Sequence, residues 1–350
     1  MEPVKIGKRM IGAGYPPYFI AEIGANHNGD MKLCKKMIDI AESCGADAVK
    51  FQSWSSNSLI SKSEYERNTD YADKKRHFGS LKSMVEKYKL TAQQHRDIFD
   101  YCSSLNIDFL SSCFSPAEVD LLESLGVIAH KISSMDVTHV KLLEYVAATG
   151  KPIILSTGMA SLSEIDRAIY VLKQNGSGPI VLLHCVSIYP PEMKDVNLNN
   201  IPMLRSAFEL PVGFSDHTIG TSIPLASIAL GACIIEKHFT IDKDMDGWDH
   251  WISADPDELK DIVTEGRAVF EALGSTRRIV SDAELEKQKS FRRSIVLVGD
   301  KKQGDILTLA DLNYKRPGTG ISPDEVNYVL GRKLSKNLED DHVLEWADMQ

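Results

Sequence analysis

Two histidines in this chain lie where apolar runs give way to polar residues. His217 follows the run that starts at Val212, and His238 ends the run that starts at Cys233. If these runs form neighbouring strands, the two imidazoles can converge on one divalent ion, with coordination positions left open for water or substrate. A hydrogen bond from either ring to a loop carbonyl is the competing interpretation, and the spacing favours neither.

Lys50 and Lys131 also end apolar runs, and a buried ammonium group is costly without a partner. An anionic substrate group therefore explains these lysines better than a packing role does. Hydroxyl side chains at similar positions would complete a phosphate and carboxylate pocket: Ser133, Ser134, Ser156, Thr157 and Ser215. Lys131 has a second interpretation, as a Schiff-base lysine of the kind that barrel aldolases use.

Glu22 interrupts the apolar start of "YFIAEIGANHNGD". Its carboxylate could orient a substrate hydroxyl or accept a proton, and a structural bond to a neighbouring strand is the alternative. Gln52 and Asp216 occupy comparable positions in their own runs, so we expect both on the same rim. Glu22 and Asp216 are candidates to activate a water molecule, as is a metal-bound hydroxide.

A frame is needed that brings the ends of these distant runs together. Short runs rich in β-branched and apolar residues number eight: Tyr18 to Glu22, Ala48 to Gln52, Asp108 to Cys113, Ala129 to Ser134, Ile153 to Gly158, Ile180 to Cys185, Val212 to His217 and Cys233 to Phe239. Segments with helical spacing lie between them, including Met31 to Ser43, Ala92 to Leu105, Val140 to Ala148, Leu162 to Lys173, Ser222 to Leu230 and Pro256 to Leu273.

This alternation predicts a closed (β/α)8 TIM barrel, whose catalytic groups lie at the carboxyl ends of the strands. A doubly wound open sheet is the rival, since both folds alternate strands with helices. No G-x-G-x-x-G or G-x-x-x-x-G-K-[ST] pattern follows the first run, and this absence favours the barrel.

The composition narrows the possible partners and the compartment. The chain has 350 residues and a formal net charge of -9, which argues against a nucleic-acid or anionic-membrane surface. Six cysteines form no C-x-x-C pair, so neither a zinc ribbon nor a disulfide framework is indicated. No targeting segment or membrane-spanning apolar run is evident, and we expect a cytoplasmic protein.

Two stretches fall outside the alternating pattern. Residues 53–90 are highly charged and predict a solvated excursion, although a long loop after a barrel strand also suits a lid. The sequence predicts a barrel domain over residues 1–280 and a charged linker or short helix over 281–292. Short apolar pieces separated by Gly and Asp turns then predict a small domain over 293–350.

Together these motifs resemble those of the sialic acid synthases, which condense phosphoenolpyruvate with an N-acylated aminohexose. The resemblance covers nearly the whole chain, in order: "AEIGANHNGD", "GADAVKFQ", "HKISSMD", "KPIILSTGM", "LLHCVSIYP", "GFSDHTIG", "IIEKHFT", "DPDEL" and "YKRPGTGI". It implies that the final domain is the antifreeze-like (SAF) domain of that family.

The resemblance also implies roles for individual positions. In that family the residues matching His217 and His238 hold Mn²⁺ or Mg²⁺. Phosphoenolpyruvate is bound by the positions matching Lys131, Ser134, Ser156 and Ser215, and the sugar by those matching Glu22, Tyr189 and Asp249. The chain departs from the family pattern at Met135, Asp136 and Ser187, and Trp248 and Trp251 flank Asp249. These differences surround the expected sugar pocket and leave the sugar open.

The resemblance finally implies a homodimer in which the last domain of one chain reaches the barrel of the other. There Arg316 of "YKRPGTG" would contact the N-acyl group, although a surface arginine in a Pro-Gly turn is the commoner case. The leading hypothesis is a metal-dependent synthase of a nine-carbon sugar acid, made from phosphoenolpyruvate and either N-acetylmannosamine or a 2,4-diacetamido-2,4,6-trideoxyhexose. A Schiff-base pyruvate aldolase and a non-catalytic sugar-binding protein are the alternatives.

Overall fold

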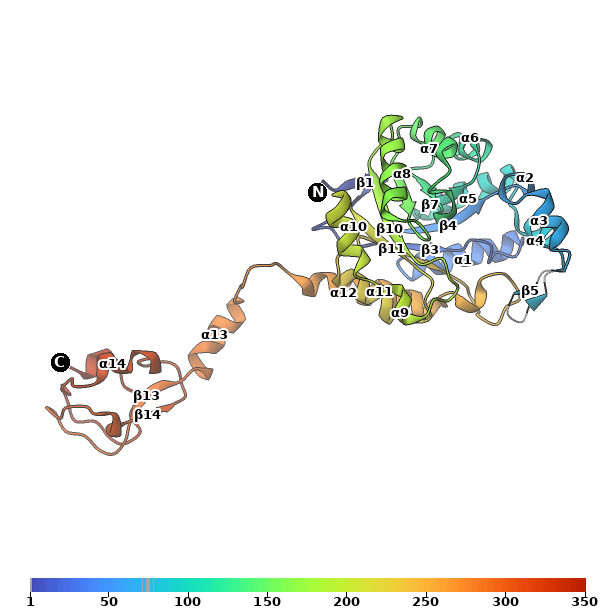
Figure 1. Ribbon diagram of the computed structural model, residues 1–350. Helices are drawn as coiled ribbons and strands as arrows, with labels where there is room; N and C mark the ends of the chain where they lie inside the picture. Colours follow the sequence, from blue (N-terminus) through green and yellow to red (C-terminus); the bar gives the residue numbers. More distant parts are fainter. Residues whose placement is uncertain (1, 71, 74–75, 78) are drawn as a thin grey trace. The chain divides into compact units, whose positions relative to one another are not determined.

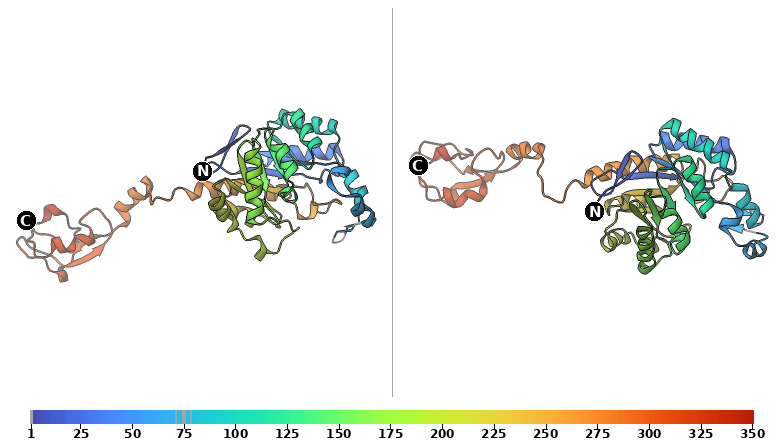
Figure 2. Two further views of the ribbon diagram at one scale, coloured as in Figure 1. Left: turned by 45° about the horizontal axis from the view of Figure 1, so that its top comes forward. Right: turned by 90° about the horizontal axis from the view of Figure 1, so that it is seen from above.

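The computed structural model describes residues 2–70, 72–73, 76–77 and 79–350, and the chain divides into two compact units, residues 1–274 and 275–350. In the first unit eight parallel strands close into a barrel surrounded by helices (Figures 1 and 2). The predicted TIM barrel is therefore confirmed. Within the described ranges, no helix is long and apolar enough to cross a membrane.

The barrel strands lie close to the predicted runs. Around the barrel they are β3 (Tyr18–Glu22), β4 (Ala48–Ser53), β7 (Asp108–Cys113), β8 (His130–Ile132), β9 (Ile153–Ser156), β10 (Ile180–Cys185), β11 (Val212–Asp216) and β12 (Ile234–His238), which pairs with β3. Strand β8 is shorter than its predicted run, because the chain leaves the sheet at Ser133 and forms a 3₁₀ turn (Ser134–Asp136).

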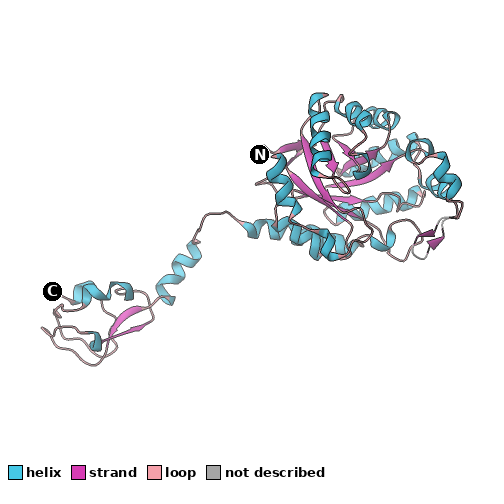
Figure 3. Ribbon diagram, viewed as in Figure 1, coloured by secondary structure: helices cyan, strands magenta, loops and turns pink. Residues whose placement is uncertain are grey.

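The main helices on the outside of the barrel are α1 (Met31–Ser43), α5 (Ala92–Leu105), α6 (Pro116–Leu125), α7 (Val140–Ala147), α8 (Leu162–Gln174), α10 (Asn200–Phe208), α11 (Ser222–Ala229) and α12 (Pro256–Leu273) (Figure 3). Local sequence fixes where several of them begin. The Asp255 carboxylate accepts the backbone N–H of Glu258 at 3.0 Å, and Pro256 occupies the first turn of α12. Such caps set the lengths of the loops that follow the barrel strands.

The interior of the barrel is apolar at the amino end of the strands. Ile20, Leu110 and Leu183 point inward and are buried with Ile6 and Ile11 of the hairpin β1 (Val4–Ile6) and β2 (Arg9–Ile11). A second cluster fills the space between the strands and the outer helices. Polar side chains therefore enter the barrel chiefly at the carboxyl ends of its strands.

The stretch 53–90 differs from the solvated excursion that its charge predicts. It forms α2 (Ser56–Leu59), α3 (Lys62–Arg67), β5 (Ala72–Asp73), β6 (Arg76–His77) and α4 (Leu81–Tyr88), while residues 71, 74, 75 and 78 lie outside the described residues. Met84 and Val85 of α4 are buried against Trp54, whose indole N–H donates to the Val85 carbonyl at 3.1 Å. Part of the stretch is therefore packed rather than solvated, because the apolar residues of α4 fall on one buried face of the helix. Its interpretation as a lid stays a prediction.

The second unit has a core of its own. It begins with α13 (Asp282–Phe291), a helix in the segment where the sequence left a linker or a helix open. It also contains the hairpin of β13 (Ser294–Leu297) and β14 (Leu312–Lys315) and the short helix α14 (Val326–Val329). The first unit has one more short helix, α9 (Met193–Val196). Ile295, Val329 and Leu344 lie at the centre of the core of the second unit.

Candidate active site

A cavity of about 430 Å³ opens at the carboxyl ends of the barrel strands. Most of the residues that the sequence singled out in the barrel line it: Glu22, Lys50, Gln52, Lys131, Ser133, Ser134, Ser156, Ser187, Tyr189, Ser215, His217, His238 and Asp249. They come from strands far apart in the chain, and the closure of the barrel brings them together.

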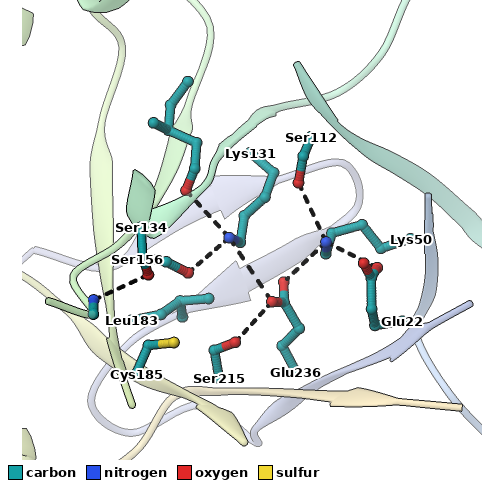
Figure 4. A network of polar contacts seen from close by, with 12 residues as sticks. Glu22, Lys50, Ser112, Lys131, Ser134, Ser156, Leu183, Cys185, Ser215 and Glu236 are labelled. Carbon is teal, nitrogen blue, oxygen red and sulfur yellow. Dashed lines mark hydrogen bonds and ion pairs between the residues drawn. The ribbon is translucent and has the colours of Figure 1, made fainter. Parts of the chain in front are cut away.

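Lys50 and Glu22 form a buried ion pair on one side of the cavity, where β3 and β4 place them directly opposite each other. Lys50 Nζ lies 2.8 Å from Glu22 Oε2 and donates to Ser112 Oγ at 3.3 Å (Figure 4). Glu22 Oε1 accepts a hydrogen bond from Gln52 Nε2 at 2.8 Å. Both carboxylate oxygens of Glu22 thus have a partner.

Lys131 lies among hydroxyl groups on the opposite side. Its Nζ donates to Ser156 Oγ at 2.7 Å and to the Ile132 carbonyl at 3.2 Å. Ser134 Oγ accepts the backbone N–H of Gly158 at 3.0 Å. A Cβ atom at Gly158 would lie 2.9 Å from Ser134 Oγ and closer still to Ser187, so glycine is needed for the serines to gather here.

Glu236 lies between the two lysines, as Figure 4 shows. Its Oε1 accepts a hydrogen bond from Ser215 Oγ at 2.9 Å and lies 3.8 Å from Lys131 Nζ, while its Oε2 lies 3.9 Å from Lys50 Nζ. The sequence analysis gave this residue no role. Its position two residues before His238 in a strand is the signal that could have found it, because alternate residues share a face.

Burial and charge act against each other in this network. Burial and the nearby Lys50 lower the pKa of Lys131 despite the attraction of Glu236. Burial opposes the charge of Lys50 as well, but Glu22 and Glu236 more than offset it and raise the pKa of Lys50. The ammonium group of Lys131 is therefore the less compensated of the two, and an anionic ligand would stabilise its charged form.

His217 and His238 face each other across the same cavity. Their ring centroids are 5.4 Å apart, and the Tyr189 ring lies 4.1 Å from that of His217. His217 Nδ1 donates to the Val186 carbonyl at 2.8 Å, so Nε2 is the nitrogen that a metal ion would take. Burial and His217 hold the pKa of His238 well below its usual value, so that ring is neutral.

The pair suits a divalent ion held by two protein ligands. No group of three or more His, Cys, Asp or Glu side chains that could hold a metal ion occurs in the described parts of the chain. Asp249 Oδ2 lies 3.8 Å from His238 Nδ1. Any ion bound by the two histidines would therefore keep several positions for water or substrate.

Three expected substrate-binding residues are not among those that line this cavity. Asp216 is buried on the outer face of β11, where its Oδ2 accepts Lys237 Nζ at 2.6 Å. Thr157 donates to the Leu183 carbonyl at 2.9 Å, and Asp136 lies 3.3 Å from His139 Nδ1. Asp216 and Thr157 lie on a different face of the chain from Ser215 and Ser156, because neighbouring residues of a strand point to opposite faces. Asp136 ends the 3₁₀ turn that begins at Ser134.

An apolar wall closes one side of the cavity. It consists of Trp54, Leu59, Phe114 and Trp248, which come from the segments that follow β4, β7 and β12. The rings of Trp54 and Trp248 meet edge to face, with centroids 6.1 Å apart. The sequence pointed to Trp248 but missed Trp54 and Leu59, because both belong to the stretch that looked solvated.

Arg316 belongs to the second unit and its expected role at a partner subunit stays a prediction. Its guanidinium lies over the ring of Phe291, with 4.7 Å between the guanidinium carbon and the ring centroid. Phe291 is half exposed and ends α13. The negative face of the ring attracts the guanidinium cation at this distance.

The comparisons with known proteins agree with the geometry. Residues 37–278 match the NeuB family and residues 292–350 match the SAF domain. The N,N'-diacetyllegionaminic acid synthase of Campylobacter jejuni is 43% identical over 331 residues, which are 93% of this chain and 98% of that protein. The synthase of the same name from Legionella pneumophila is 39% identical, over 97% of this chain and 96% of its own.

A solved structure shows the same fold. The N-acetylneuraminic acid synthetase of Leptospira borgpetersenii, crystallised in complex with citrate, superposes with a TM-score of 0.74 at 36% identity. The match covers 82% of this chain and 95% of that one. These relatives are named synthases, and the chain is an enzyme that belongs to the NeuB family and ends in a SAF domain.

Proposed function

We propose that the enzyme condenses phosphoenolpyruvate with an N-acyl-aminohexose and releases a nine-carbon sugar acid and phosphate. The observation that carries this proposal is that one cavity contains two arrangements. Lys131 is buried among serines with its charge only partly compensated, and His217 and His238 face each other. The first arrangement suits a phosphate or carboxylate, and the second suits a metal-assisted carbonyl. The names of the relatives point to the same chemistry.

Phosphoenolpyruvate would bind at the end of the cavity formed by Lys131, Ser134 and Ser156. The charge of Lys131 and the hydroxyl donors are already fixed by the barrel strands, so they need little reorganisation when a phosphate binds. Lys50 lies on the other side of Glu236 and would take the second anionic group of the substrate. Holding both ends fixes the direction of the methylene carbon between them.

The metal site would be formed by His217 and His238. A divalent ion bound there would polarise the aldehyde oxygen of the acceptor sugar as a Lewis acid. The hydrogen bond to the Val186 carbonyl orients the His217 ring, and the Tyr189 ring packs against its face. Glu22, which is next to His238 in the barrel, is placed to orient a hydroxyl group of the same sugar.

For the acceptor we favour a 2,4-diacetamido-2,4,6-trideoxyhexose over N-acetylmannosamine. The wall of Trp54, Leu59, Phe114 and Trp248 offers aromatic and aliphatic surface. The diacetamido sugar lacks the 6-hydroxyl and carries a second acetyl methyl, so it has more apolar surface to pack against this wall than N-acetylmannosamine has. Two relatives of about 40% identity are named diacetyllegionaminic acid synthases, which is consistent with this choice.

The test is phosphate release by the purified full-length protein. The protein is incubated with Mn²⁺, phosphoenolpyruvate and either sugar, and free phosphate and product mass are measured. We expect release only when both substrates are present, with a higher kcat/KM for the diacetamido sugar. If no phosphate is released with either sugar, the proposed function is contradicted. A clear preference for N-acetylmannosamine contradicts only the choice of acceptor.

The lowered pKa of Lys131 also suits a second candidate, a Schiff-base pyruvate aldolase. A neutral amine at this position could attack the carbonyl of free pyruvate. This function predicts that borohydride traps pyruvate on Lys131 and that a chelator leaves the activity unchanged. The synthase predicts the opposite in both experiments.

A further inference from the structure

Glu236 differs from Glu22, the other glutamate of the cavity, in the distance between its Oε2 and the nearest ammonium nitrogen. In Glu22, Oε1 accepts a hydrogen bond from Gln52, and Oε2, which accepts none, lies 2.8 Å from Lys50 Nζ in an ion pair. Glu236 is only 6% exposed, yet its Oε2 accepts no hydrogen bond from any residue that the structure describes. The nearest ammonium nitrogen, Lys50 Nζ, lies 3.9 Å away, beyond hydrogen-bond distance. A buried carboxylate oxygen without a donor is costly and calls for a ligand.

The direction of this oxygen is fixed by the barrel. Ser215 and Glu236 are paired residues of the neighbouring strands β11 and β12, and Ser215 Oγ donates to Oε1. This bond distinguishes Oε1 from Oε2. Glu236 lines the cavity between Lys131 and Lys50, which Figure 4 shows on either side of it, and its buried Oε2 is the oxygen on the Lys50 side.

The proposed reaction needs a water molecule at such a place. Once the methylene carbon of phosphoenolpyruvate has bonded to the aldehyde carbon, the former enol carbon is electron-poor and water adds to it. If Lys131 and Lys50 hold the two anionic groups on either side of that carbon, Oε2 of Glu236 faces it from the protein. The other carboxylate that the sequence suggested, Asp216, lies outside the cavity in its ion pair with Lys237.

We propose that Glu236 orients the attacking water by accepting a hydrogen bond from it at Oε2, an inference that rests on the proposed function. The water oxygen forms the new carbon–oxygen bond. One of its protons ends on the oxygen of the former aldehyde. The bond from the former enol carbon to the phosphate oxygen then breaks with its electron pair on phosphate, and the water oxygen becomes the carbonyl oxygen at that enol carbon. The second proton leaves with phosphate, and Glu236 ends the step unchanged.

The experiment compares Glu236→Gln with wild type and with a matched control, Glu123→Gln. Glu123 is also a paired carboxylate, bound by His130 and Lys151, but it lies outside the cavity. Steady-state kinetics give kcat, and calorimetric titration gives Kd for phosphoenolpyruvate. We expect kcat of Glu236→Gln to fall on the order of 10²-fold, because a misplaced reactant loses about that much. The Kd for phosphoenolpyruvate should not rise, because the substitution removes a negative charge from a site that binds an anion.

The Glu236→Asp protein keeps the charge but withdraws it, and should recover part of kcat. A kcat of Glu236→Gln equal to that of the control overturns the inference, and so does a loss confined to Kd, which a purely structural counter-ion would give. If Glu236→Gln does not fold, Ser215→Ala, which releases Oε1, must show the loss in kcat. A wild-type protein that releases no phosphate with any acceptor overturns the proposed function as well, whereas an active wild type isolates this step.

Discussion

Lys131 and Lys237 are buried to nearly the same extent, with 3% and 2% of their surface exposed, but they lie on opposite faces of the barrel wall. Outside the barrel, Lys237 donates to Asp216 and to the Thr218 carbonyl, both at 2.6 Å. Inside it, the carboxylate nearest to Lys131 is 3.8 Å away, and the lysine faces a cavity. Equal burial thus accompanies two different roles, and the partners of the charge tell them apart.

The largest effect that this comparison predicts is the loss of activity in Lys131→Met. Removing the ammonium group should lower kcat/KM on the order of 10³-fold, because a fixed charge that binds a phosphate is lost. Stability should change little, since methionine fills a similar volume and the charge was poorly compensated. Steady-state kinetics with thermal unfolding as the control measure both; an active variant would show that the inner lysine holds no substrate.

Lys237→Met should have the reverse profile. It leaves the Asp216 carboxylate buried beside the Thr218 N–H without its cation, and breaking a buried pair in this way costs about 3–5 kcal/mol. The folded fraction should keep the kcat of wild type. Denaturant unfolding and kinetics at low temperature test this, and an unchanged midpoint would mean that the outer pair contributes nothing to stability.

Metal removal sharpens the comparison on the inner face. With two protein ligands, the ion should be stripped by EDTA, and activity should return with Mn²⁺. The His217→Ala protein should contain less metal than wild type in the same buffer, and its kcat should fall about 10²-fold. Metal content by mass spectrometry is the independent readout; a His217→Ala protein with a full metal complement would exclude this site.

The smallest expected effect concerns the apolar wall. Trp248→Ala should reduce the preference for the diacetamido-trideoxyhexose by about tenfold in kcat/KM, which is what the loss of one apolar contact costs. Trp346→Ala, at a half-exposed tryptophan of the second unit that stacks on Arg332, is the matched control. An unchanged ratio of the two sugars in Trp248→Ala would remove the wall from the account of specificity.

The barrel could be predicted from the sequence because each strand has two signals, an apolar run and polar residues at the end of that run. It did not reveal which of two adjacent polar residues points inward. Ser215 and Asp216 look alike in sequence, and only the register of β11 against β12 places one inside and one outside. The same ambiguity hid Glu236, and the charge of residues 53–90 hid Trp54.

The central claim is that the inner face binds phosphoenolpyruvate and that water adds to its enol carbon. The most direct test is to run the reaction in water enriched in the heavy isotope of oxygen and to weigh both products. The account predicts that the sugar acid carries the heavy oxygen at the former enol carbon and that the released phosphate carries none. Heavy oxygen in the phosphate, with an unlabelled sugar acid, would mean that the phosphorus–oxygen bond breaks and would contradict it.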